Sequence, residues 1–125
     1  MAVERARLIL GSFDHLVVLG DFFKHEFSEP LFDVVYERTF LCSMPQRLWP
    51  NYVARMCQLI RPGGNLVGFF LYGQAVEPPP YPMTELQGKM LFGRDFKCAE
   101  DEPISDSLPV FAGMERWQEW TRKSA

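Results

Sequence analysis

Two short loops in this sequence carry residue types that can bind a charged or aromatic ligand. In the first loop, Asp21 and Phe22 follow a short apolar run at residues 15–19. A carboxylate beside an aromatic ring suits an adenine, because the acid accepts a hydrogen bond from the exocyclic amine while the ring covers the face of the base. The same pair also suits a plainer role, in which Asp21 caps a turn and Phe22 packs in the core.

The second loop places an acid and an arginine side by side. Glu37 and Arg38 follow an apolar run at residues 32–36. The planar guanidinium of Arg38 suits carboxylate or phosphate groups, which it can bind through two parallel hydrogen bonds. The two side chains can equally form a solvated ion pair that contributes little. The sequence alone leaves both interpretations open.

Other patterns for catalysis or metal binding have little support. The chain has two histidines and three cysteines without a C-x-x-C pair, so no metal site is predicted. Neither His15 nor His25 has a nucleophile or a carboxylate partner that the sequence identifies, which leaves a catalytic triad unsupported. The sequence also contains no G-x-G-x-x-G turn and no P-loop to hold a dinucleotide or phosphate.

The composition predicts one globular domain over residues 1–125. A hydrophobic fraction of 47% is enough for a single core. A net charge of −3 with scattered basic residues argues against a nucleic-acid partner. The longest apolar stretch, around residues 66–72, is far shorter than the roughly 20 residues that cross a bilayer. The N-terminal residues do not have the pattern of a secretory signal, so we expect a cytoplasmic protein that does not enter a membrane.

The pattern of apolar residues predicts an α/β fold. Residues 15–19, 32–36 and 65–72 are apolar runs typical of strands buried in a parallel sheet. A helix from Pro45 to about residue 60 shows apolar residues at three- and four-residue steps and ends at Pro62-Gly63-Gly64. This strand, helix and strand form the crossover unit of a parallel sheet. Ligands of such sheets bind beyond the carboxyl ends of the strands, where both loops lie.

The remaining segments follow the same rules. Residues 2–10 predict a helix without an N-cap, and a short helix is expected over residues 84–91 with Thr84 as its cap. Residues 94–100 and 114–121 predict two further strands. The proline-rich segment between the third predicted strand and the short helix is expected to be a rigid, extended loop.

Taken together, these motifs resemble the thiopurine/thiol S-methyltransferase family. The matching segments are GDFF at 20–23, FDVVYERTFLCSMP at 32–45, YVARMCQLIRPGGNLVGFFLYG at 52–73 and PPPY at 78–81. The ending GMERWQEWTRK is similar to the closing antiparallel strand of the family. The resemblance spans nearly the whole chain. It implies an incomplete doubly wound, Rossmann-like α/β sheet of parallel strands with an antiparallel C-terminal strand.

The same resemblance implies a cofactor and site residues. Asp21 and Phe22 match the loop that holds the adenine of S-adenosyl-L-methionine, and Arg38 matches an arginine near both cofactor and substrate. Pro79, Pro80 and Tyr81 match a loop that borders the substrate pocket. The small-molecule substrate would be a thiol, a thiopurine or a similar soft nucleophile. A thiolate needs positioning more than it needs a general base, which agrees with the absence of a recognisable base.

The glycine-rich turn and the ribose-binding acid of the family lie upstream of these motifs and are not in this sequence. We therefore expect the truncated, C-terminal part of a methyltransferase fold, inactive as an isolated chain. Residues 15–19 would lack a neighbouring strand, and the open sheet edges would allow a homodimer. Two alternatives stay open: a non-enzymatic half-fold module for dimerisation or small-molecule binding, and an unrelated α/β enzyme such as an oxidoreductase fragment.

Overall fold

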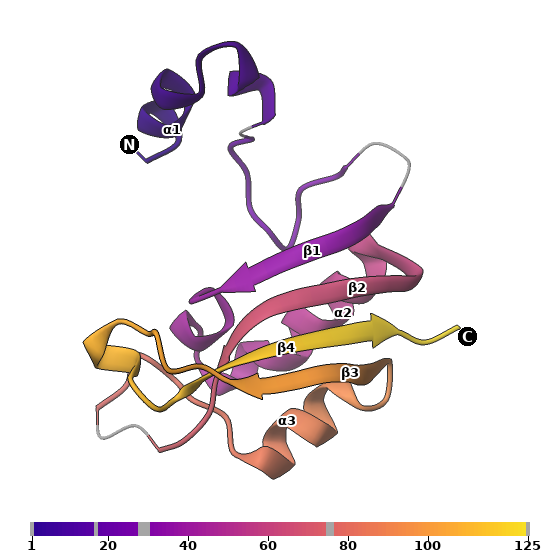
Figure 1. The fold of residues 1–125 in the computed structure, drawn as a ribbon. Coiled ribbons are helices and arrows are strands. Elements are labelled where there is room, and N and C mark those ends of the chain that lie inside the picture. The colour runs from indigo at the N-terminus through magenta and orange to yellow at the C-terminus, as the bar shows by residue number, and fades with distance from the viewer. Residues whose placement is uncertain (1, 17, 28–30, 75–76, 125) are drawn as a thin grey trace.

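The computed structural model describes residues 2–16, 18–27, 31–74 and 77–124. In these residues a four-stranded sheet packs against two helices, with a third helix near the N-terminus (Figure 1). The helices are α1 (Ala2–Leu10), α2 (Trp49–Leu59) and α3 (Glu85–Phe92). The strands are β1 (Phe32–Arg38), β2 (Ile60–Leu71), β3 (Phe96–Pro103) and β4 (Glu115–Arg122). Short 3₁₀ helices cover Gly11–Leu16, Leu41–Ser43, Gln46–Leu48 and Pro109–Phe111.

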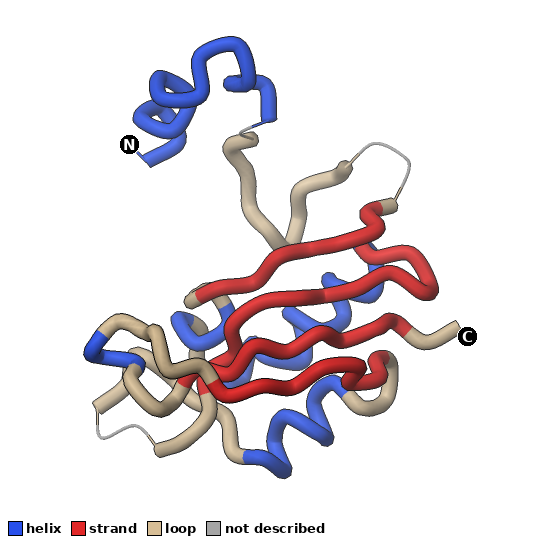
Figure 2. Tube along the Cα trace, in the orientation of Figure 1, coloured by secondary structure: helices blue, strands red, loops and turns tan. Residues whose placement is uncertain are grey.

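The sheet has the strand order β1-β2-β4-β3. The strands lie side by side in one sheet (Figure 2). β1 and β2 are parallel, whereas β4 runs antiparallel to both β2 and β3. The connection between the two parallel strands passes through α2, which lies behind the sheet in the view of Figure 1. This arrangement confirms the predicted α/β fold of parallel strands with an antiparallel C-terminal strand.

Most predicted elements form with shifted boundaries. The helix predicted from Pro45 begins at Trp49, because Pro45 has an extended backbone and the next three residues form a 3₁₀ turn. The proline in the first turn of α2 is Pro50. Residues 61–64 do not form a helix end outside the sheet. They lie within β2, where they bulge between the register pairs Phe32–Ile60 and Val34–Asn65.

One predicted strand is wrong. Residues 15–19 do not join the sheet: Gly11–Leu16 form a 3₁₀ helix, and residues 18–20 are outside any strand. Val17 lies outside the described residues. A parallel strand needs a neighbour for its backbone hydrogen bonds, and no strand of the described sheet pairs with these residues. Val18 and Leu19 are accordingly 53% and 61% exposed.

The core lies between the sheet and the pair α2 and α3. Phe92 of α3 is at its centre: its ring stacks on Trp120 with centroids 5.0 Å apart and meets Phe70 and Phe96 edge to face. Among the described residues, the largest fully buried side chains are Tyr52, Ile60, Leu66, Phe70, Met83, Phe92 and Phe96. This packing holds β2 in place and, through the pairing of β2 with β1, positions the carboxyl ends of both strands.

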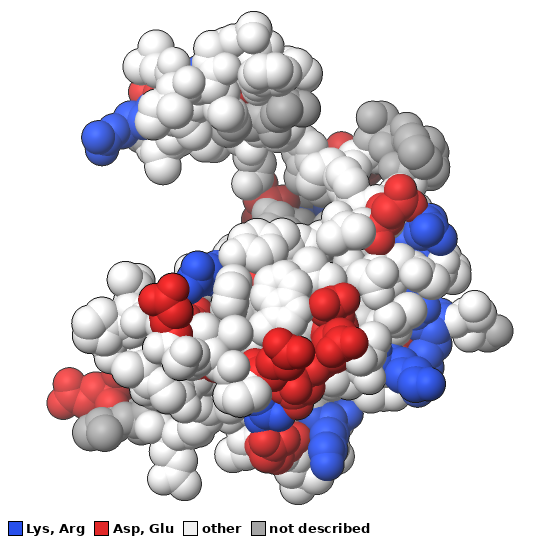
Figure 3. All heavy atoms as spheres, in the orientation of Figure 1, with Lys and Arg blue, Asp and Glu red and all other residues white. Residues whose placement is uncertain are grey.

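No helix of the described residues packs on the opposite face of the sheet. Val34 and Tyr36 of β1 remain 55% and 59% exposed on it. Figure 3 shows this face with an uncharged centre and acidic side chains gathered over β3 and β4. Helix α1 stands apart from the sheet, and none of its described residues is buried (Figure 1).

Candidate active site at the carboxyl ends of β1 and β2

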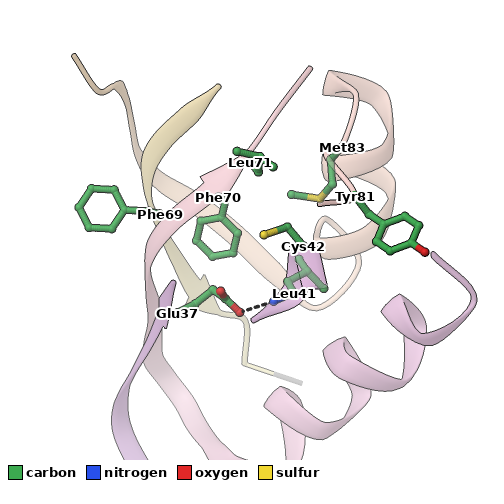
Figure 4. Close-up of a pocket in the computed structure, with 8 residues that line it drawn as sticks. All are labelled: Glu37, Leu41, Cys42, Phe69, Phe70, Leu71, Tyr81 and Met83. Carbon is green, nitrogen blue, oxygen red and sulfur yellow. Dashed lines mark hydrogen bonds between the residues drawn. The ribbon is translucent and has the colours of Figure 1, made fainter. Parts of the chain in front are cut away.

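Four segments of the chain meet beyond the carboxyl ends of the two parallel strands. They are the end of β1, the 3₁₀ turn Leu41–Ser43, the end of β2 and the loop before α3. A small pocket between them is lined by Glu37, Leu41, Cys42, Phe69, Phe70, Leu71, Tyr81 and Met83 (Figure 4). The backbone N–H of Tyr81 donates to the carbonyl oxygen of Cys42 at 2.7 Å, which ties two of these segments together. Doubly wound sheets bind their ligands at such a place.

Glu37 points into the protein and organises the turn that follows β1. Its side chain is 3% exposed and accepts three hydrogen bonds, from Tyr52 Oη at 2.7 Å, Phe40 N at 3.0 Å and Leu41 N at 3.1 Å. Figure 4 shows the bond to Leu41. Burial raises the pKa of Glu37 above its ordinary value, and the hydrogen bonds from Tyr52, Phe40 and Leu41 oppose that shift.

Arg38 points to the other face of the sheet. Its Nη2 donates to Oε1 of Glu115 on β4 at 3.3 Å, and its guanidinium lies 4.2 Å from the ring centroid of Phe69. Glu37 and Arg38 therefore do not form the solvated pair that the sequence allowed, because successive side chains of a strand point to opposite faces. The Arg38 side chain is 39% exposed, whereas Glu115 is buried.

Asp21 and Phe22 lie on the same side of α2 as the Glu37 turn. Asp21 Oδ1 accepts a hydrogen bond from Phe23 N at 2.8 Å, so Asp21 does cap its own turn. The centroid of the Phe22 ring lies 5.0 Å from that of Phe40 and 5.9 Å from that of Tyr52. Asp21 remains exposed, and together with Phe22 it borders an open pocket.

The proline-rich loop reaches the site through one residue. Pro79 is exposed and Pro80 is half-buried. Tyr81 lines both the small pocket and a wider polar groove, which also contains Gln46 and Gln87. The structure therefore brings Tyr81 to the turn after β1, whereas neither Pro79 nor Pro80 lines the small pocket or the groove.

Two residues of α2 that the sequence did not single out are central to the site. Tyr52 is fully buried and binds Glu37. Arg55 donates from Nε to the carbonyl oxygen of Phe22 at 2.7 Å and from Nη2 to that of His25. The sequence does contain a feature that points to Tyr52, because a tyrosine on the apolar stripe of a helix needs a hydrogen-bond partner for its hydroxyl. It contains no such feature for Arg55, since the acceptors of Arg55 are backbone carbonyls.

The described residues contain no cluster of His, Cys, Asp or Glu that could hold a metal ion. Within the same ranges, no helix is long and apolar enough to cross a bilayer.

The fold is that of Rossmann-like methyltransferases. The chain is similar to 1,6-didemethyltoxoflavin-N1-methyltransferase from Burkholderia thailandensis, whose crystal structure holds 1,6-didemethyltoxoflavin and S-adenosylhomocysteine. The two superpose with a TM-score of 0.68 at 15% identity, over 86% of this chain and 50% of the other. At this identity the likeness defines the fold class.

Sequence comparison defines the family. The sequence model of the thiopurine S-methyltransferase family matches residues 9–123. Thiopurine S-methyltransferase from Vibrio parahaemolyticus is 34% identical over 117 residues, which are 88% of this chain and 53% of that protein. Probable thiol methyltransferase 2 from Arabidopsis thaliana is 28% identical over 106 residues, 83% of this chain and 46% of that protein. The chain belongs to the thiopurine S-methyltransferase family and spans about half the length of these relatives.

Proposed function

We propose that the protein serves methyl transfer from S-adenosyl-L-methionine to a small thiol, thiopurine or similar soft nucleophile. The observation that carries the proposal is the meeting of the predicted ligand loops at one end of the sheet. The turn after β1 contacts the Asp21–Phe22 loop through Phe40 and the proline-rich loop through Cys42. Membership of the family and the S-adenosylhomocysteine bound to the similar Burkholderia enzyme support this cofactor.

Asp21, Phe22 and Arg38 are the proposed cofactor residues. Asp21 fits an adenine because one carboxylate oxygen holds the turn while the exposed side chain can still accept from an exocyclic amine. Phe22 borders the same open pocket as Asp21 and offers apolar surface for a base. S-adenosyl-L-methionine, when bound, would supply the electrophilic methyl group.

Arg38, Pro79, Pro80 and Tyr81 are the proposed substrate residues. Arg38 is held by Glu115 and by the Phe69 ring, so its remaining N–H groups are oriented before a ligand arrives. We assign no general base, because an ionised thiol attacks without one. Glu37 would not serve as one: its oxygens already accept three hydrogen bonds that build the turn.

We also propose that these 125 residues carry the adenine and substrate side of the site and have little activity as an isolated chain. The sequence has no glycine-rich turn to hold the methionine and ribose parts of the cofactor. Weak binding of S-adenosylhomocysteine is then expected. A cytoplasmic location is part of the same proposal, since small thiols and reduced cofactors are abundant there.

The test is a calorimetric titration of S-adenosylhomocysteine into the wild type and Arg38→Lys. Lysine keeps a positive charge beside Glu115 but lacks the planar fork of arginine. The affinity should fall about tenfold while the melting temperature changes little, as expected for the loss of about 1.4 kcal/mol from a ligand contact. Arg61→Lys, in an exposed pair with Asp33, is the matched control. Equal losses of melting temperature and affinity would contradict a ligand-binding role for Arg38.

A non-enzymatic role in dimerisation or small-molecule binding is the second candidate. It is favoured by β1, which pairs with β2 alone among the described strands and exposes Val34 and Tyr36. Such an edge can pair with a second copy of the chain. A stable dimer by light scattering, together with no binding of S-adenosylhomocysteine, would favour this candidate over the methyltransferase.

A further inference from the structure

Arg55 of α2 fastens a loop to the body of the protein. We call residues 20–27 the 20–27 loop. Nε of Arg55 donates to the carbonyl oxygen of Phe22 at 2.7 Å, and Nη2 donates to the carbonyl oxygen of His25. Nη1 donates to Gln58 Oε1 at 3.1 Å, on the next turn of the same helix. All three guanidinium nitrogens are therefore in use, two of them on the backbone of one loop.

The other polar contacts of the 20–27 loop that involve Asp21 are internal. The carbonyl oxygen of Asp21 accepts from Lys24 N at 3.1 Å and from His25 N at 2.8 Å. Its Oδ1 accepts from Phe23 N at 2.8 Å. These bonds give the loop its shape, but they do not attach it to α2. The attachment comes from Arg55, from the ring contacts of Phe22 with the core and from the ring contact of Phe27 with Phe32 of β1.

The absence of a strand before the loop makes this attachment important. In a doubly wound sheet, a ligand loop takes its position from the strand that it follows. Residues 18–20 are not in a strand here, so no backbone ladder fixes the position of Asp21. A planar guanidinium with fixed donor directions can hold two carbonyl oxygens in place of that ladder.

We propose that Arg55 is a positioning residue that holds the 20–27 loop, and with it Asp21, where an adenine ring would bind. The choice of adenine as the ligand rests on the proposed function, whereas the attachment of the loop to α2 rests on the hydrogen bonds of Arg55. Arg55 acts through the carbonyl oxygens of Phe22 and His25 and needs no contact with the cofactor.

Hydrogen exchange of the full chain tests the attachment independently of any ligand. The amides of Phe23, Lys24 and His25 are hydrogen-bonded within the loop and report its opening. In Arg55→Met they should exchange at least about tenfold faster than in the wild type. Arg55→Lys should be intermediate, because its three N–H donors sit on a single nitrogen and lack the fixed, separated directions of the guanidinium. Amides of β2 should not change. Arg61→Met, which removes an exposed ion pair, is the matched control and should leave the loop unchanged.

Titration of S-adenosylhomocysteine against the same variants tests the role toward the ligand. We expect its affinity to fall in the order wild type, Arg55→Lys, Arg55→Met. Unchanged exchange at the three loop amides would overturn the proposal, whatever the affinity. Faster exchange with unchanged affinity would overturn the positioning role. No binding to the wild type would overturn the proposed function and the role toward adenine, while faster exchange would still establish Arg55 as the residue that fixes the loop.

Discussion

Replacing Glu37 by glutamine should loosen the turn after β1 at a cost that the structure allows us to work out. Oε1 of Glu37 accepts from Tyr52 and Leu41, and Oε2 accepts from Phe40 at 3.0 Å. In Glu37→Gln the amide oxygen can take over the two bonds of Oε1. The amide NH₂ then faces Phe40 N–H, and two donors oppose each other in a partly buried site.

The loss of one acceptor at such a site costs about 1–3 kcal/mol. For a chain of this size, the melting temperature should fall by roughly 4–12 °C. Urea unfolding of wild type and Glu37→Gln measures the free energy directly. Glu100→Gln, an exposed residue of β3, is the matched control and should change the stability by less than about 0.5 kcal/mol.

The pH dependence separates the two physical effects at Glu37. Burial raises its pKa in the folded state above the ordinary value of 4.5, so between these two values the folded chain binds more protons than the unfolded chain. The contribution of Glu37 to stability is therefore largest below pH 4.5 and is lost as the pH rises to the folded pKa. The stability advantage of the wild type over Glu37→Gln should narrow with rising pH across this window. An advantage that widens with rising pH would instead show that the three hydrogen bonds outweigh burial and lower the pKa of Glu37.

Two further predictions concern the frame that carries the site. Gly68→Ala should lower the free energy of unfolding, measured in urea, by more than about 3 kcal/mol. An added Cβ would lie 1.8 Å from the carbonyl oxygen of Glu37, and the backbone φ of 152° at Gly68 disfavours other residues. A loss below about 1 kcal/mol would contradict the tight pairing of β1 with β2. Thr84→Ala should lower the free energy of unfolding by about 1 kcal/mol, because it removes the capping box formed with Gln87. Thr84→Ser should retain most of the stability. An unchanged unfolding midpoint in Thr84→Ala would contradict the capping role.

The sequence predicts the elements of the fold that depend mainly on local features. The apolar run of β1, the stripe of α2 and the cap at Thr84 are local features, and the corresponding elements form in the structure. Residues 15–19 show the limit of such patterns. Their composition suits a buried strand, but a strand also needs a neighbour, and a run of residues does not tell whether one is present.

The candidate site was predictable by residue type but not by partner. Arg38 stands out because an arginine follows a predicted strand, yet its partner Glu115 lies 77 residues away. Glu37 and Arg38 are neighbours in the sequence, although alternation along the strand sends their side chains to opposite faces. The role of Arg55 has no signature in the sequence, because its acceptors are backbone carbonyl groups.

The proposed function requires that the loops beyond β1 and β2 and the 20–27 loop form one ligand site. Amide chemical shifts of the labelled chain, followed while S-adenosylhomocysteine is added to millimolar concentration, measure whether they do. We predict weak, saturable shifts that are confined to residues 20–27, Arg38 and the turn at Leu41–Ser43. Saturable shifts centred on α1 or β3, or no shifts at all, would contradict it.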